Sequence, residues 1–253
     1  MRQSLRVYSG DPSLAIFLQP DYDVVERVVT FRLADGGILD PGLLYHVDLF
    51  EPEADDGAGF LAFDGAPLER GDAPLHFSFR TARAVPAAPP TRKTPTCDDT
   101  LAVFADACSA CHAGTAAFMG LRLESGSDLR ETAISHVARE TEGPRAGTPL
   151  VDPARFGVGM PLVDPGSPAS SYLVYKLLAK AENFGSDCST IHRAALPPGV
   201  CPLATDGERG RLGDWFVRLA PMPENGALLG GLDDLRTVVG YIRAGASTSS
   251  CSP

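Results

Sequence analysis

Hydrophobic and polar residues alternate along three short stretches near the start of the chain. The stretches are 28–33, 45–50 and 75–80, and in each of them one set of alternate positions is apolar. Period-two alternation is typical of an antiparallel strand with one buried face. His46 and His76 fall on the polar side of their strands, so we expect both imidazoles to face solvent.

Turn residues separate these stretches and complete a β-rich pattern. Short strands at even spacing, divided by Asp-Gly and Pro-Gly turns, are typical of a small β-sandwich. We therefore expect residues 1–85 to form an all-β domain. The turns lie at Asp35–Gly37, Asp40–Gly42, Asp56–Gly57 and Asp64–Gly65.

A proline-rich linker then precedes a region with helical periodicity. Residues 86–96 contain repeated prolines, which favour an extended, semi-rigid spacer. From Cys97 onward apolar residues recur at helical spacing, which predicts an all-α domain over residues 97–253. After the helix that starts near Cys97, further helices are expected over 129–139, 170–181, 208–219 and 233–244.

The first of these helices leads into Cys108-Ser109-Ala110-Cys111-His112. Cys-x-x-Cys-His is the attachment signature of c-type haem, in which two thiols bond to the porphyrin and the histidine ligates the iron. The sequence therefore predicts one covalently bound haem c at Cys108 and Cys111, with His112 as the proximal axial ligand.

Two other uses of a Cys-x-x-Cys pair fit this chain less well. A thioredoxin-like redox pair opens a βαβ unit, and no such unit is visible near Cys108. A structural zinc site needs two further ligands at matching spacing, and the chain holds no second Cys-x-x-Cys motif. A chance match among six cysteines is the remaining alternative.

The other four cysteines are expected to form two disulfides. An even remainder suits an oxidising compartment, and of the three possible connectivities we favour Cys188–Cys201, which closes a short loop, together with Cys97–Cys251. The alternative is four unpaired buried thiols.

The net charge and the presence or absence of targeting segments indicate which partners and which cellular location to expect. The net charge of −10 argues against a nucleic-acid partner, because phosphates would repel the protein, and favours a redox protein with a basic docking face. No apolar run is long enough to span a bilayer. Met1–Leu5 lacks the apolar core of a signal peptide. We nevertheless expect a periplasmic or extracellular protein, with this chain beginning inside a longer precursor and the first strands of the sandwich missing.

The N-terminal part also resembles a known family. Residues Tyr22–Phe31, Leu39–Tyr45 and Phe77–Thr81 are similar to those of a bacterial Ig-like domain. The resemblance covers about the first 85 residues and implies a spacer or docking module without chemistry of its own.

The remainder resembles class I cytochrome c domains from about residue 97 to 246. In that family the first and last helices cross beside the haem, which makes Phe104 and Tyr241 the expected aromatic contacts at the crossing. One departure is the missing proline after the haem histidine, so another backbone carbonyl must orient the imidazole. The residues that carry the likeness are Val103–His112, Gly120–Leu123, Val163–Leu178, Pro221–Pro223 and Leu232–Ala246.

The resemblance implies that a methionine before the closing helix is the sixth ligand of the iron. Met222, which lies between two prolines, is the expected distal axial ligand, because it occupies the place of the family's ligand. A thioether ligand raises the reduction potential relative to a second imidazole. The alternatives are Met160, His192, His136 or an open site, whereas Met119 is too close to His112 in sequence.

These features lead to one expected function and two rivals. The expected function is one-electron transfer by an exported monohaem cytochrome rather than enzymatic catalysis, because two axial ligands leave no place on the iron for substrate. The first rival is a haem peroxidase or ligand sensor with an open or displaceable sixth site. The second is an envelope adhesion or structural protein in which the haem is incidental.

Overall fold

The computed structural model describes residues 4–23, 25, 28–34, 37–50, 59, 75–83, 93–138, 160–180, 217 and 220–251. These residues fall into two compact units. One unit holds the described residues before Tyr22 and from Val29 to Arg83, and the other holds the stretch around Val25 together with the described residues from Lys93 onward. Each unit has its own buried hydrophobic cluster.

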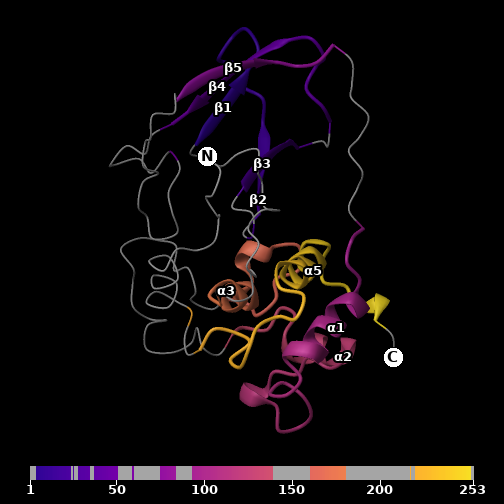
Figure 1. Cartoon of the computed structure of the whole chain (residues 1–253). Helices are drawn as coiled ribbons and strands as arrows, with labels where there is room; N and C mark the ends of the chain where they lie inside the picture. Colours follow the sequence, from indigo (N-terminus) through magenta and orange to yellow (C-terminus); the bar gives the residue numbers. More distant parts are fainter. Residues whose placement is uncertain are drawn as a thin grey trace. The chain divides into compact units, whose positions relative to one another are not determined.

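The N-terminal strands form two small sheets (Figure 1). Strands β1 (Leu5–Tyr8), β4 (Leu44–Leu49) and β5 (His76–Arg80) make a three-stranded antiparallel sheet in the order β1-β4-β5. Strands β2 (Leu18–Asp23) and β3 (Val28–Leu33) make a two-stranded sheet. The register places Tyr45 opposite Phe79 and Val47 opposite Val7, so the alternation in the sequence indicates the strand positions well.

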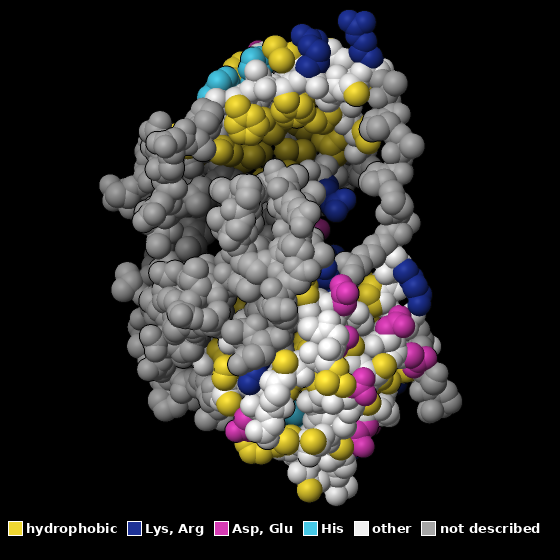
Figure 2. All heavy atoms as spheres, viewed as in Figure 1, with side chains coloured by type: hydrophobic (Ala, Val, Ile, Leu, Met, Phe, Trp, Pro, Cys, Tyr) yellow, Lys and Arg dark blue, Asp and Glu magenta, His cyan; other side chains and the backbone are white. Residues whose placement is uncertain are grey.

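Few side chains are buried on the inner face of the three-stranded sheet. Its buried cluster consists of Val7, Tyr45 and Val47, while all five residues of β5 are exposed within the described part of the chain. Figure 2 shows hydrophobic side chains at the surface in the region of β1, β4 and β5. Phe77 and Phe79 are among these exposed apolar residues.

The opposite face of the same sheet carries the two histidines. His76 is exposed, as expected, and its Nδ1 lies 2.6 Å from Asp48. His46 is half-buried rather than fully solvent-facing, because its ring stacks between Tyr8 and His76 with centroid distances of 5.2 and 5.7 Å.

The second unit contains four α-helices among the described residues, together with short 3₁₀ turns. The helices are α1 (Cys97–Ala107), α2 (Gly126–Thr132), α3 (Tyr172–Leu178) and α5 (Leu232–Arg243). Single 3₁₀ turns occur at Phe118–Gly120, Pro168–Ser170 and Thr248–Ser250.

Helices α1 and α5 pack against each other (Figure 1). The apolar stripe of α5 includes Leu235 and Ile242, both almost fully buried. Gly240 lies on α5 beside Pro95, where a side chain would come within about 3 Å of the proline ring. Phe104 and Tyr241, expected at the crossing, are both buried in this core.

The expected fold class, an all-β sandwich followed by an all-α domain, is wrong. The described chain has a mixed α and β composition, with five strands in two separate small sheets and four α-helices. The second unit also contains β-bridges between Ile134 and Val163 and between Val137 and Pro161. The spacing of apolar residues predicted most helices and strands correctly. The number of strands in each sheet, however, depends on pairing between strands far apart in sequence, and the spacing within one strand carries no information about that pairing.

One predicted helix is displaced and another cannot be compared. The helix expected over 129–139 is in fact α2, which ends at Thr132, because Ile134 and Val137 pair in β-bridges. The helix expected over 208–219 lies outside the described residues apart from Val217, as does the linker stretch 84–92.

Candidate functional site

Helix α1 ends directly before the cysteine pair, which lines a cavity. Its N-terminus is closed by a capping box, in which Thr96 Oγ1 accepts a hydrogen bond from the Asp99 amide and the Asp99 carboxylate accepts one from the Thr96 amide at 2.8 Å. The hydrogen bonds that this carboxylate accepts from the Thr96 amide and the Thr96 hydroxyl hold the pKa of Asp99 below its usual value. The helix then continues to its C-cap residue, Cys108, whose amide donates a hydrogen bond to the Phe104 carbonyl at 2.8 Å.

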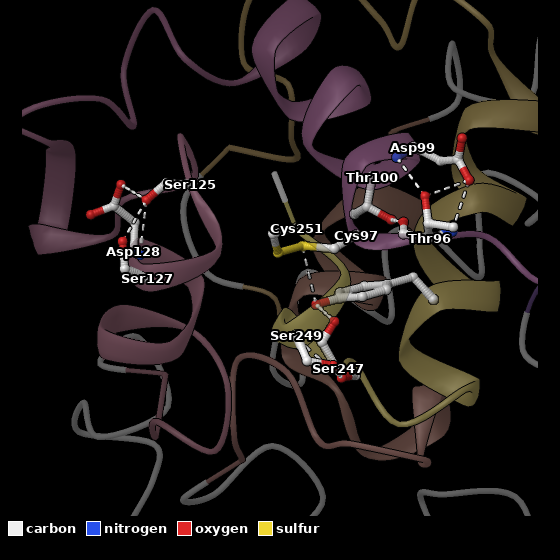
Figure 3. The surroundings of a disulfide bond; sticks show 11 residues. Thr96, Cys97, Asp99, Thr100, Ser125, Ser127, Asp128, Ser247, Ser249 and Cys251 are labelled. Atoms are coloured by element: carbon white, nitrogen blue, oxygen red, sulfur yellow. Dashed lines mark hydrogen bonds between the residues drawn. A yellow bond between two sulfur atoms is a disulfide. The ribbon is translucent and has the colours of Figure 1, made fainter. Parts of the chain in front are cut away.

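The start of α1 is also tied covalently to the end of the chain. Cys97 and Cys251 form a disulfide (Figure 3), which confirms one of the two expected pairings. Tyr241 donates a hydrogen bond from its hydroxyl to the carbonyl of Ser247 at 3.3 Å, close to this disulfide. The other expected pair, Cys188–Cys201, lies outside the described residues.

We expect the Cys97–Cys251 disulfide to contribute about 3–5 kcal/mol to the free energy of unfolding. It spans 154 residues of sequence, and a cross-link that closes a long loop removes more conformational entropy from the unfolded chain than one that closes a short loop. Guanidinium unfolding of the Cys97→Ala/Cys251→Ala variant should show this loss, and a reductant should affect the wild type more than the variant. Equal unfolding midpoints for the two proteins would contradict the estimate.

A tight turn after α1 brings the histidine next to the two thiols. The amides of Cys111 and His112 both donate to the Cys108 carbonyl, at 3.1 and 2.9 Å. Cys108 and Cys111 are both unpaired thiols, the first half-buried and the second exposed. The three residues therefore lie within one turn of backbone, as the motif requires.

His112 is held in place by the chain that follows it. His112 is only 8% exposed, and its Nδ1 lies 3.3 Å from the Leu121 carbonyl oxygen. A carbonyl can only accept, so Nδ1 carries the proton and Nε2 is the nitrogen suited to ligate a metal. Leu121 thus supplies the backbone carbonyl that the missing proline made necessary.

The reversal of the chain between His112 and Leu121 depends on its backbone conformation. Met119 and Gly120 have positive φ angles of 57° and 73°, a region in which glycine is strain-free and most other residues are not. The Leu123 amide then donates to the His112 carbonyl at 3.0 Å. Sequence reasoning did not identify Leu121; the Met-Gly pair after the motif was the available signal for a turn back toward the histidine.

The predicted haem residues line one cavity of about 590 Å³. Cys108, Cys111, His112 and Met222 all contribute to its wall, although they come from segments more than 100 residues apart. This volume is within the range of small-molecule and cofactor sites. Most of the remaining wall is apolar and includes Phe118, Leu121, Leu123, Leu162, Tyr172, Leu173 and Leu177.

Met222 reaches this cavity from the segment that precedes α5. Its amide donates to the Lys176 carbonyl of α3 at 3.0 Å, so the position of the methionine is set by a neighbouring helix. Met222 packs against the main core and is partly buried.

The alternative ligands are placed less favourably. Met160 is buried in the core, where its carbonyl accepts from the Ala138 amide, and it does not line the cavity. Met119 and His136 do line it, but both are exposed, and the His136 Nε2 lies 3.2 Å from the Arg130 carbonyl. His192 lies outside the described residues.

The Cys108 thiol is not activated as a nucleophile in this environment. Burial, together with the neighbouring Cys111, raises the pKa of Cys108 to about 12. Redox-active Cys-x-x-Cys pairs depend on a lowered thiol pKa, so the site lacks the electrostatic character of a thioredoxin-like centre. A neutral thiol in an apolar wall is compatible with a bulky hydrophobic occupant.

The donor set fits haem better than a bare metal ion. Within the described residues, no group of three or more His, Cys, Asp and Glu side chains could hold a metal ion. Haem instead supplies four nitrogen ligands to its iron, so the protein has to provide only one or two axial ligands. His112 and Met222, together with two thiols and an apolar wall, match that requirement.

In the described part of the chain, no helix is both long enough and apolar enough to cross a membrane. No family model matches the chain, and neither the curated proteins nor the solved structures include a significant match.

Proposed function

We propose that this protein is an exported monohaem c-type cytochrome that transfers single electrons. The observation that carries the proposal is the convergence of Cys108, Cys111, His112 and Met222 on one apolar cavity. The sequence alone singles out these four residues, which include a methionine 110 residues after the histidine. The resemblance to class I cytochrome c domains supports the same function.

The residues of the chain have distinct tasks in this proposal. Cys108 and Cys111 would hold the haem through thioether bonds, His112 would bind the iron through Nε2, and Met222 would bind it through sulfur. When bound, the haem supplies a reversible one-electron couple. The Leu121 carbonyl fixes the orientation of the imidazole, and the mostly apolar wall around a bound haem would favour the form of lower charge.

The covalent and electrostatic features of the chain support an exported protein with a basic partner. The Cys97–Cys251 disulfide favours an oxidising compartment, either the periplasm or the cell exterior. The net charge of −10 favours docking to a positively charged redox protein. Glu131 and Glu224, which line the cavity and are exposed, contribute acidic charge close to the site of electron transfer.

The proposal is tested on protein produced together with a c-type haem maturation system. We expect the intact mass to exceed the polypeptide mass by one haem, and the reduced and oxidised proteins to give the absorbance spectra of a low-spin c-type haem. Reversible reduction should leave the mass unchanged. A matured chain without added haem would refute the proposed function.

A further inference from the structure

The polar face of the three-stranded sheet brings two imidazoles together. His46 lies on β4 and His76 on β5. They share one face, because His76 pairs with Asp48 and residues two apart on a strand point to the same side. Their ring centroids are 5.7 Å apart and their ring planes differ by 20°. Figure 2 shows histidine side chains at the surface of this part of the molecule.

Asp48 determines which nitrogen of His76 carries the proton. Its Oδ1 lies 2.6 Å from His76 Nδ1, and its Oδ2 accepts hydrogen bonds from Nε and Nη2 of Arg6 at 3.0 and 2.7 Å. The contacts with His76 and then with Arg6 hold the pKa of Asp48 below its usual value. Because an ionised carboxylate can only accept, Nδ1 carries the proton and the lone pair of the neutral imidazole lies on Nε2. Histidines that bind metals are commonly oriented by a carboxylate in this way.

The nitrogen atoms suited to bind a ligand are accessible. Within the described part of the chain, His76 Nε2 and both ring nitrogens of His46 have no hydrogen-bond partner. His76 is exposed, and His46 is half-buried with its ring stacked between those of Tyr8 and His76. His46 can therefore turn about its Cβ–Cγ bond, a torsion with a broad energy minimum, without breaking a hydrogen bond.

The separation of the two rings matches that of two imidazoles bound to one metal ion. A metal–nitrogen bond to histidine is about 2.0–2.1 Å long, and the ring centroid lies about 1.1 Å beyond the nitrogen. Two rings on one ion therefore have centroids about 4.5 Å apart at a right angle and about 6.4 Å apart on opposite sides of the ion. The distance of 5.7 Å between His46 and His76 lies between these limits.

This pair offers two protein ligands, which restricts the kind of ion it suits. No three or more His, Cys, Asp and Glu side chains among the described residues form a group that could hold a metal ion. Both oxygens of Asp48 are already engaged by His76 and Arg6. Imidazole ligands suit the later divalent transition ions, among which copper(II) binds most strongly, with water completing its coordination. The net charge of −10 attracts cations to the chain at long range.

We propose that His46 and His76 form a binding site for copper(II), in which Asp48 orients His76 and is not itself a ligand. His76 binds through Nε2 and His46 through one ring nitrogen. The inference does not depend on the proposed haem function, because none of these residues lines the haem cavity. Sequence alternation placed both imidazoles on the polar sides of their strands, but only the pairing of β4 with β5 brings them together.

The test titrates Cu²⁺ into the full-length chain at neutral pH by isothermal titration calorimetry. Each histidine is replaced by a residue that keeps its structural contact. His46→Phe keeps an aromatic ring in the stack, and His76→Asn keeps an N–H donor close to Asp48. Every titration is repeated in the Cys108→Ala/Cys111→Ala chain, which is the matched control, because it keeps both histidines and removes two thiols that also bind copper. Circular dichroism of the metal-free proteins checks folding, and a variant that loses structure is replaced by its glutamine counterpart.

We expect a site for one copper(II) ion whose affinity falls roughly 100-fold in either histidine variant, because the second imidazole binds intramolecularly once the first has bound. Asp48→Asn should weaken binding by at least about tenfold, the usual effect of removing a group that orients a metal ligand. In the Cys108→Ala/Cys111→Ala chain, electron paramagnetic resonance should show two imidazole nitrogens on the copper. His46→Phe or His76→Asn should reduce that number to one.

Two results would overturn the inference. Unchanged copper affinity in both histidine variants would show that the ion binds elsewhere on the chain. A loss of affinity confined to one of the two variants would show that His46 and His76 do not act as a pair. Haem uptake is measured separately, so a chain that binds copper at these histidines and takes up no haem would refute the proposed function alone.

Discussion

Replacing Cys108 and Cys111 together by alanine is expected to abolish covalent haem attachment completely. Each thiol accounts for one thioether bond, and within the described residues the remaining cysteines of known state, Cys97 and Cys251, are already joined to each other. The intact mass of the matured double variant should equal that of the bare polypeptide. Any haem that His112 and Met222 still hold should be extracted by acidified organic solvent, whereas wild-type haem should stay with the chain.

The two single variants distinguish attachment from general damage to the fold. Cys108→Ala and Cys111→Ala should each keep at most one thioether. The Cys97→Ala/Cys251→Ala variant removes two cysteines that do not line the cavity, as many as the Cys108→Ala/Cys111→Ala variant removes, and should keep both thioethers. Haem that remains covalently bound to the Cys108→Ala/Cys111→Ala variant would show that the motif is not the attachment site. Loss of haem from the disulfide variant would instead mean that stability of the fold controls loading.

The positions of most helices and strands could be predicted because local patterns determine them. The apolar stripe from Leu235 to Ile242 and the acidic residues at the start of that helix are sufficient to predict α5. The alternation around Val47 is sufficient to predict β4. The grouping of strands into two sheets was not predictable, since β1 pairs with β4 and not with β2, its neighbour in sequence.

The candidate site shows the same division between local and long-range information. Cys108, Cys111 and His112 are adjacent in sequence, so their proximity follows from one turn of backbone. The prediction that Met222 lies near that turn depended on a family resemblance. The spacing of residues alone could not have predicted its presence in the cavity wall. Leu121 contributes through its backbone carbonyl, which any residue type possesses, so no sequence pattern distinguishes it.

Replacing Met222 by leucine is expected to remove the near-infrared sulfur-to-iron charge-transfer band of the oxidised protein. Leucine keeps the apolar volume of the partly buried side chain but has no sulfur to donate. The reduction potential should fall by roughly 0.1–0.3 V, since axial ligands set haem potentials over a range of about 0.8 V and a methionine ligand raises them. The Met222 amide should still donate to the Lys176 carbonyl, so covalent haem content should be unchanged.

The vacated sixth position also decides between electron transfer and an open-site function. We expect the wild type to bind cyanide or carbon monoxide slowly, because Met222 must first leave the iron, and the Met222→Leu variant to bind them without a lag. Met160→Leu and Met119→Leu are the matched controls: Met160 lies in the core away from the cavity, and Met119 lies at its exposed rim. Both controls should keep the charge-transfer band and the wild-type potential. Loss of the band in Met119→Leu and its persistence in Met222→Leu would assign the distal ligand to Met119. Rapid ligand binding by the wild type would favour a sensor or peroxidase over an electron carrier.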